Sequence, residues 1–137
     1  QNPPLTESDP QMSLRKVLVT DDEETVRTAL TASIETFDGF EVDTAEDGAI
    51  GLAKISGERY DVVLVDLMMP VMDGFEVLRQ LRDMDDDSRP DRVILVSGMV
   101  DPALQANVRE FGGDAILGKP FRLDDLRRLL VDELTPL

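Results

Sequence analysis

The chain has 137 residues, of which 14 are Lys or Arg and 29 are Asp or Glu, so its formal net charge is −15. That length suits a single domain with one core. The acidic balance argues against a nucleic-acid partner or an anionic membrane surface, because both need clustered basic residues. The chain has no Cys and no His, which excludes a disulfide framework, a zinc site built on thiolates and any use of an imidazole.

The start of the chain has neither a signal-peptide pattern nor an apolar run long enough to span a membrane, so the sequence predicts a soluble, cytoplasmic protein. Residues 1–13 are rich in Pro and polar side chains and have too little to bury, so we expect a disordered tail there. The folded domain is expected to cover residues 14–137.

The first half of the domain alternates strand and helix patterns. Residues 14–20 predict a strand, and the acidic run at 21–24 suits the start of a helix, where exposed N–H groups favour negative charge. The inward face of that helix is predicted to hold Val26, Ala29, Leu30, Ile34 and Phe37. Residues 40–45 predict a second strand, and a short second helix is predicted to bury Ala49, Leu52, Ala53 and Ile55.

The second half continues the alternation. Residues 61–66 form an apolar run that ends on Asp66, as in a strand covered on both faces. A helix follows at about residues 75–84, with an inward face predicted to hold Phe75, Leu78 and Leu81. Residues 92–97 and 115–118 predict two more strands, and Asp101-Pro102 predicts the start of the helix between them. The last helix is predicted from a stripe of Leu123, Leu126, Leu129, Leu130 and Leu134.

Five strands alternating with five helices predict a doubly wound α/β domain with a parallel sheet. Connections between parallel strands are right-handed, so the carboxyl ends of all strands lie at one edge, where such sheets place their sites.

Polar side chains collect at that predicted edge: Asp21, Asp22, Asp66, Ser97 and Lys119. Three neighbouring carboxylates repel one another unless a hard cation joins them, and Mg²⁺, or alternatively Mn²⁺, suits oxygen ligands. A strand-tip carboxylate beside a metal, a lysine and a hydroxyl has the parts that phosphoryl transfer needs, with the carboxylate as nucleophile.

Each feature alone also has an ordinary structural interpretation. The acidic run is typical of a helix start, and Asp73-Gly74 is typical of a turn. Ser97 suits the end of a strand, and a lone Lys before Pro, such as Lys119, ordinarily lies on the surface. The functional interpretation therefore depends on their combination at one edge of the sheet.

Over about residues 15–134 the chain resembles the receiver domain of two-component response regulators. The resemblance rests on Asp21-Asp22, on Asp66-Leu67-Met68-Met69-Pro70 with Met72-Asp73-Gly74, on Ser97-Gly98 and on Lys119-Pro120-Phe121. It implies a flavodoxin-like, three-layer α/β/α fold with strand order 2-1-3-4-5.

The resemblance also implies the role of each site residue. Asp66 would accept a phosphoryl group from the phosphohistidine of a sensor histidine kinase or a phosphotransfer protein, as a signalling switch and not as an enzyme. Mg²⁺ would be held by Asp22, Asp66 and the backbone carbonyl of Met68, with Asp21 acting mainly through water.

Lys119 would pair with the phosphorylated aspartate, Ser97, next to Gly98, would rotate onto the phosphoryl oxygens, and the Lys119-Pro120 peptide bond is expected to be cis. The output would pass to a downstream protein effector or an attached module, while the domain itself binds neither nucleic acid nor membrane.

One position departs from the family pattern. Members commonly carry an aromatic residue three positions before the lysine, which rotates inward in the active state, and here that position is Ile116. Two routes for the signal stay open: movement of loops and backbone, or the face of the first helix.

Rival classes fit less well. A phosphohydrolase of the haloacid dehalogenase kind needs a second Asp two residues after the nucleophile, where this chain has Met68. A dinucleotide or flavin domain needs a phosphate-cradling loop after the first strand, where this chain has an acidic run. A DNA-binding parent stays possible, and the sequence leaves open a free-standing receiver or one cut from a longer kinase or transcription factor.

Overall fold

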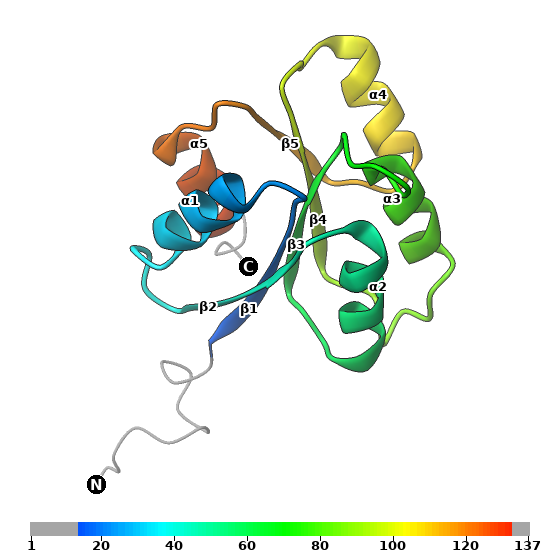
Figure 1. Ribbon diagram of the computed structural model, residues 1–137, viewed down its shortest axis with the longest axis horizontal. Helices are drawn as coiled ribbons and strands as arrows, with labels where there is room; N and C mark the ends of the chain where they lie inside the picture. Colours follow the sequence, from blue (N-terminus) through cyan, green and yellow to red (C-terminus); the bar gives the residue numbers. More distant parts are fainter. Residues whose placement is uncertain (1–13, 133–137) are drawn as a thin grey trace, which may run out of the picture.

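The computed structural model describes residues 14–132 (Figure 1), so the expected tail at 1–13 and the predicted Leu134 contact lie outside the described residues. The strands are β1 (Arg15–Thr20), β2 (Phe40–Ala45), β3 (Val62–Asp66), β4 (Arg92–Ser97) and β5 (Ala115–Gly118). The helices are α1 (Glu24–Ile34), α2 (Gly48–Gly57), α3 (Gly74–Arg82), α4 (Pro102–Glu110) and α5 (Leu123–Arg127), which continues as the π-helical turn η2 (Arg128–Asp132).

The strands form one parallel sheet in the order β2-β1-β3-β4-β5, which confirms the predicted fold. The central strand β3 is buried along its whole length, as its continuous apolar sequence predicts. Its register pairs Asp66 with Val96 on β4 and Val65 with Thr20 on β1. The end of β3 therefore lies beside the ends of both neighbouring strands.

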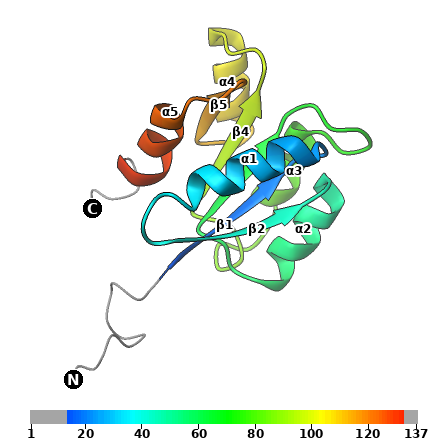
Figure 2. The ribbon, with the colours of Figure 1, turned by 60° about the vertical axis from the view of Figure 1, so that its left-hand side comes forward.

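Helices cover both faces of the sheet (Figures 1 and 2). On one face Val62 and Leu64 share a core with Leu30 of α1 and Leu126 of α5. On the other face the side chains of β3 pack against the second core, which includes Ile55 of α2, Leu78 of α3 and Val108 of α4. Burying each of these side chains contributes about 1.5–3 kcal/mol, so the two cores hold the strand ends in a fixed frame.

Aspartate side chains cap three of the helices that follow the strands. Asp47, Asp73 and Asp101 accept hydrogen bonds from the backbone N–H groups of the first turns of α2, α3 and α4 at 2.8–2.9 Å. Pro102 stands in the first turn of α4, as predicted. These caps set where each helix begins and therefore how long each loop at the carboxyl edge is.

Several predicted helix contacts were wrong. Ala29, Ala49 and Ala53 are exposed, because a methyl group contributes little burial and does not fix the direction of a helix face. On α3, Leu78 and Leu81 are buried as predicted and Val77 is buried as well, while Phe75 is half-buried and lies against the ring of Phe111, 5.0 Å between centroids. In the last helix Leu126, Leu129 and Leu130 are buried as predicted, whereas Leu123 is half exposed at its start.

Among residues 14–132, no helix combines the length and the apolar character that crossing a lipid bilayer requires.

Candidate functional site

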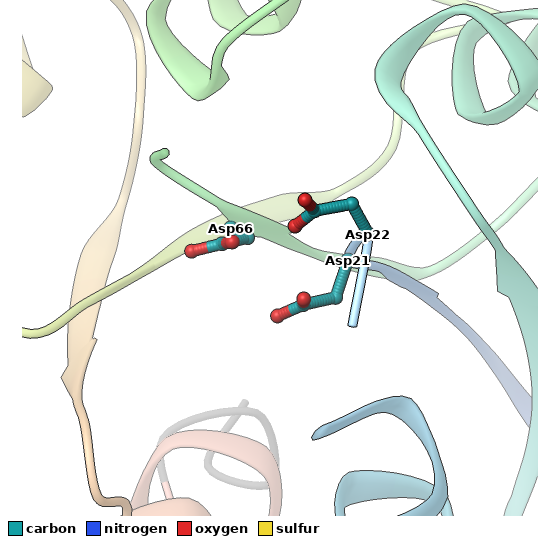
Figure 3. Close-up of side chains that lie close together, drawn as sticks. All are labelled: Asp21, Asp22 and Asp66. Carbon is teal, nitrogen blue, oxygen red and sulfur yellow. The ribbon is translucent and has the colours of Figure 1, made fainter. Parts of the chain in front are cut away.

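Three carboxylates meet at the carboxyl edge of the sheet, and we call them the acidic cluster: Asp21, Asp22 and Asp66 (Figure 3). Each contributes an oxygen that lies within 4.8 Å of the other two. Asp21 follows β1 directly and Asp66 is the last residue of β3, which explains why they converge from adjacent strands. Asp21 and Asp66 are buried, at 1% and 4% exposure, while Asp22 is exposed at the mouth of the site.

Backbone contacts fix the first loop of the cluster. The N–H of Glu23 donates to Asp21 Oδ1 at 2.8 Å, and the Arg27 guanidinium on α1 donates to the carbonyl oxygen of Asp21 at 2.6 Å. The other carboxylate oxygen, Asp21 Oδ2, is buried and has no hydrogen-bond partner among the described residues. Although this oxygen accepts no hydrogen bond, it forms an ion pair with Lys119 Nζ at 3.4 Å.

Lys119 supplies the positive charge of the site. Its Nζ lies 3.1 Å from Asp66 Oδ1, 3.4 Å from Asp21 Oδ2 and 3.8 Å from Glu23 Oε1. Burial alone would lower the pKa of Lys119, but the hydrogen bond to Asp66 and the charges of both aspartates outweigh it, so the pKa is raised. Lys119 is therefore a firmly charged ammonium beside Asp66.

The carboxyl of Asp66 is held in an unfavourable environment for its ionised form. Burial raises its pKa most, the charge of Asp21 adds to that effect, and the contacts with Lys119 and with the N–H of Met68 only partly oppose it. A carboxylate held this way gains from any further cation placed beside it.

Ser97 and its loop lie at the same edge but are not bonded to the carboxylates. Ser97 is buried, and its hydroxyl donates to the carbonyl of Met99 at 2.7 Å and accepts from the N–H of Met99 at 3.1 Å. The N–H of Lys119 donates to the carbonyl of Ser97 at 2.7 Å, which ties the ends of β4 and β5 together. Gly98 is exposed in this loop, and Ile116 is half-buried on β5 and packs against the core on the α3 and α4 side.

The Lys119-Pro120 peptide bond is cis. It follows β5 directly, at the position where the chain turns from the strand toward α5.

Sequence reasoning treated Asp73-Gly74 only as a turn, and the structure gives it a closer connection to the site. Asp73 caps α3, while a Cβ on Gly74 would lie 2.8 Å from the Cα of Leu67 and 3.0 Å from the carbonyl oxygen of Asp66. Gly74 thus permits α3 to start directly against the backbone of the acidic cluster. In the sequence, only the presence of Gly at position 74 indicates this close approach of α3 to the backbone of Asp66 and Leu67, because such a contact leaves no periodic pattern.

The residues present fit a hard divalent cation. All donor atoms in the cluster are oxygens, which Mg²⁺ and Mn²⁺ prefer, and the buried Asp21 Oδ2 accepts no hydrogen bond. Without a cation, two buried carboxylates share the single ammonium of Lys119.

The sheet order, the cluster and the flanking lysine define an α/β domain with an acidic site at the carboxyl edge of its sheet. The profile of the response regulator receiver domain matches residues 17–131, so the chain belongs to that family. It is therefore a signalling domain of the two-component type.

Named relatives agree with this assignment. The response regulator MprA of Mycolicibacterium vanbaalenii is 39% identical over 124 residues, which cover 88% of this chain and 52% of that protein. The protein of the same name from Mycobacterium sp. strain KMS is 40% identical over 111 residues, 81% of this chain and 46% of its own length. The chain thus spans about half the length of the curated relatives that it matches.

Solved structures give the same fold. The chemotaxis response regulator CheY4 of Vibrio cholerae has a TM-score of 0.78 at 32% identity, covering 85% of this chain and 96% of that one. The receiver domain of the sensor histidine kinase PA1611 from Pseudomonas aeruginosa has a TM-score of 0.75 at 26% identity, covering 85% and 94%. That structure is described with a magnesium ion coordinated in its active-site cleft.

Proposed function

We propose that Asp66 is the phospho-acceptor of this receiver domain and that the phosphoryl group comes from a phosphohistidine on a sensor histidine kinase or a phosphotransfer protein. The single observation that carries this proposal is the setting of Asp66: a buried carboxylate at a strand tip, 3.1 Å from a lysine ammonium and within 4.8 Å of two more carboxylates. Phosphoryl transfer needs such a positioned nucleophile with fixed charges around it.

The cation site follows from the same cluster. Asp22 and Asp66 would hold Mg²⁺ together with the backbone carbonyl of Met68, while Asp21 would act mainly through a bound water. A bound divalent cation would offset the charge of the transferred phosphoryl oxygens. The three carboxylate oxygens that lie within 4.8 Å of one another support a shared cation.

The transfer step uses the chain's own groups as follows. A carboxylate oxygen of Asp66 attacks the phosphorus atom, the new P–O bond forms as the P–N bond of the donor breaks, and the released imidazole takes up a proton. Lys119, already charged and close to Asp66, pairs with the phosphoryl oxygens.

The switch would begin at Ser97. For its hydroxyl to donate to the phosphoryl group, Ser97 must give up its hydrogen bond to the carbonyl of Met99, so the loop between β4 and α4 would rearrange. Because Ile116 replaces the usual aromatic residue, we propose that loop and backbone movement carries the signal onward to a protein effector or an attached output module.

The experiment that tests this function is labelling with acetyl phosphate and Mg²⁺, followed by intact mass spectrometry. Wild type should gain one phosphoryl group, which hydroxylamine should remove because it is an acyl phosphate, and Asp66→Asn should gain none. Asp85→Asn, which alters an exposed acid in the loop before β4, should label like wild type. No labelling of wild type, or labelling of Asp66→Asn at the wild-type rate, would refute the assignment.

A further inference from the structure

Arg27 lies in the first turn of α1 and contacts the acidic cluster without belonging to it. Its guanidinium donates to the backbone carbonyl oxygen of Asp21 at 2.6 Å, a short hydrogen bond from a charged donor. Carboxylates are plentiful nearby, since Glu23 and Glu24 precede Arg27 in the sequence. Even so, Arg27 forms no ion pair within residues 14–132. Its guanidinium is directed at the main chain of the cluster.

The start of α1 differs from the starts of the three helices that follow it. The helices α2, α3 and α4 each begin at an Asp whose side chain accepts a hydrogen bond from the first turn. In α1 the residue at that position is Glu23, whose side chain accepts none. The carboxylate of Asp21 bonds to the N–H of Glu23, which lies before the helix. Arg27 supplies the missing connection, because its side chain reaches back from α1 to the loop.

The oxygen that Arg27 holds belongs to the peptide bond between Asp21 and Asp22. A peptide bond is planar, so fixing its oxygen fixes the direction from one Cα to the next. The preceding peptide is held by the sheet, because the N–H of Asp21 donates to the carbonyl of Ala45 at 3.1 Å. Figure 3 shows the carboxylates of Asp21 and Asp22 both pointing from the end of β1 toward Asp66. The contact with Arg27 therefore orients two carboxylates of the cluster at once.

Orientation of the ligands matters more for a small divalent cation than for a large one. Mg²⁺ requires a nearly ideal octahedron of oxygens at about 2.0–2.1 Å, whereas Ca²⁺ accepts a flexible shell at about 2.3–2.6 Å. The charge of Arg27 acts in the opposite sense, because a guanidinium beside the site repels every cation. Position and charge therefore predict different effects on the binding of the two ions.

We propose that Arg27 is a positioning residue of the cation site, which favours Mg²⁺ over Ca²⁺ by holding the peptide plane between Asp21 and Asp22. This inference rests on the proposed function, since it takes the acidic cluster to bind a divalent cation. It adds a determinant of which cation binds, in a side chain that does not ligate the ion. Loss of such an outer contact typically weakens metal binding by about 10- to 100-fold.

The test is thermal unfolding of the full chain over a series of Mg²⁺ or Ca²⁺ concentrations at constant ionic strength, which yields a dissociation constant for each ion. Arg27→Met removes the charge and the donors but keeps the length of the side chain, and Arg27→Lys keeps the charge and a donor. Arg79→Met is the matched control. It changes the net charge by the same amount, and Arg79 lies on α3 in an ion pair with Glu76.

For Arg27→Met we expect the dissociation constant of Mg²⁺ to rise about tenfold and that of Ca²⁺ to rise by less than about threefold. Arg27→Lys should restore most of the preference for Mg²⁺, because its ammonium can donate to the same carbonyl oxygen. Arg79→Met should bind both ions like wild type. The ratio of the two dissociation constants decides the outcome, because a general loss of stability changes both in the same way.

Three results for Arg27→Met would overturn the proposal while leaving the cation site in place. Equal weakening of both ions would show that Arg27 supports only the fold. Tighter binding of both ions would show that the guanidinium acts only through its charge, and unchanged binding would show that its contact with Asp21 does not affect the site. If neither ion stabilised wild type, the cation site of the proposed function would fail first and this inference with it.

Discussion

Lys119 Nζ lies between two buried carboxylates, 3.1 Å from Asp66 Oδ1 and 3.4 Å from Asp21 Oδ2. One ammonium therefore separates two aspartates that would otherwise face each other as like charges away from water. Lys119 therefore stabilises the buried aspartates of the folded domain, and in the proposed function the same ammonium would pair with the phosphoryl oxygens.

Replacing Lys119 with Met should lower the free energy of unfolding near neutral pH by about 2 kcal/mol, because the buried aspartates lose their shared partner. Urea unfolding measures this loss. Lys54→Met is the matched control: Lys54 also bonds an aspartate, Asp43, but both side chains are more than a third exposed, so the loss should stay below about 1 kcal/mol. An equal loss of unfolding free energy in Lys119→Met and Lys54→Met would contradict the claim that Lys119 is the shared partner of the buried aspartates.

Mg²⁺ should stabilise wild type in thermal unfolding, since a ligand that binds only the folded state adds about 2.7 kcal/mol at a hundred times its dissociation constant. Asp22→Asn should weaken this response strongly, because it removes a carboxylate that would ligate the ion directly. Asp85→Asn, in an exposed acidic loop, should respond like wild type. If both variants lost the response equally, the cation would be binding diffusely to the acidic surface and not at the cluster.

Gly74→Ala should destabilise the domain by about 1–3 kcal/mol, because the new methyl group would meet the backbone of Leu67 and the side chain of Leu95, at 2.8 and 2.6 Å. It should also slow labelling by acetyl phosphate, since the strain falls on the loop beside Asp66. Gly57→Ala serves as the control in urea unfolding, because its Cβ would meet nothing within 4 Å. Gly74→Ala with wild-type stability would mean that the loop relaxes easily.

The sequence predicted what depends on repeated local patterns. The apolar run that ends at Asp66 identified β3 and placed the proposed acceptor at its tip, because only a strand covered on both faces keeps such a run. The acidic pair and Lys119 could be brought to one edge from the parallel topology alone. Family resemblance then supplied the strand order that the structure confirms.

What the sequence did not predict depends on close approach and backbone conformation. The close contact of Gly74 with the backbone of Asp66 and Leu67 and the left-handed φ of Val71 arise from how the loop closes onto α3, and neither leaves a periodic signal. The two hydrogen bonds between Ser97 and Met99 were missed for the same reason. The face of α1 was misjudged at Ala29 because a small side chain weakens the periodicity from which the face is predicted.

The hydrogen bond between the buried Tyr60 and Asp43 of β2 should stabilise the domain less in acid. The Tyr60 hydroxyl donates to Asp43 Oδ2 at 2.7 Å. Burial alone would raise the pKa of Asp43, but hydrogen bonds from Tyr60, Lys54 and the N–H of Thr44 outweigh it, so the pKa lies below the ordinary 3.8. A depressed carboxyl pKa stabilises the folded state fully above pH 3.8, and this contribution is lost as the pH falls through the lower folded value.

Tyr60→Phe should therefore unfold at lower urea than wild type at about pH 7, by up to about 1 kcal/mol, and the difference should shrink at about pH 3. Asp43→Asn provides the control, because in that background the effect of Tyr60→Phe should no longer depend on pH. A difference between wild type and Tyr60→Phe that is the same at both pH values would show that the hydroxyl acts without the charge of Asp43.

The central claim is that Asp66 carries the phosphoryl group, and borohydride trapping tests it most directly. Borohydride reduces an aspartyl phosphate to homoserine, so the chain is labelled with acetyl phosphate and Mg²⁺, reduced, digested and sequenced by tandem mass spectrometry. We predict homoserine at position 66 and at no other aspartate. Homoserine at Asp21 or Asp22 in place of Asp66, or no homoserine in a chain that carries a phosphoryl group, would contradict it.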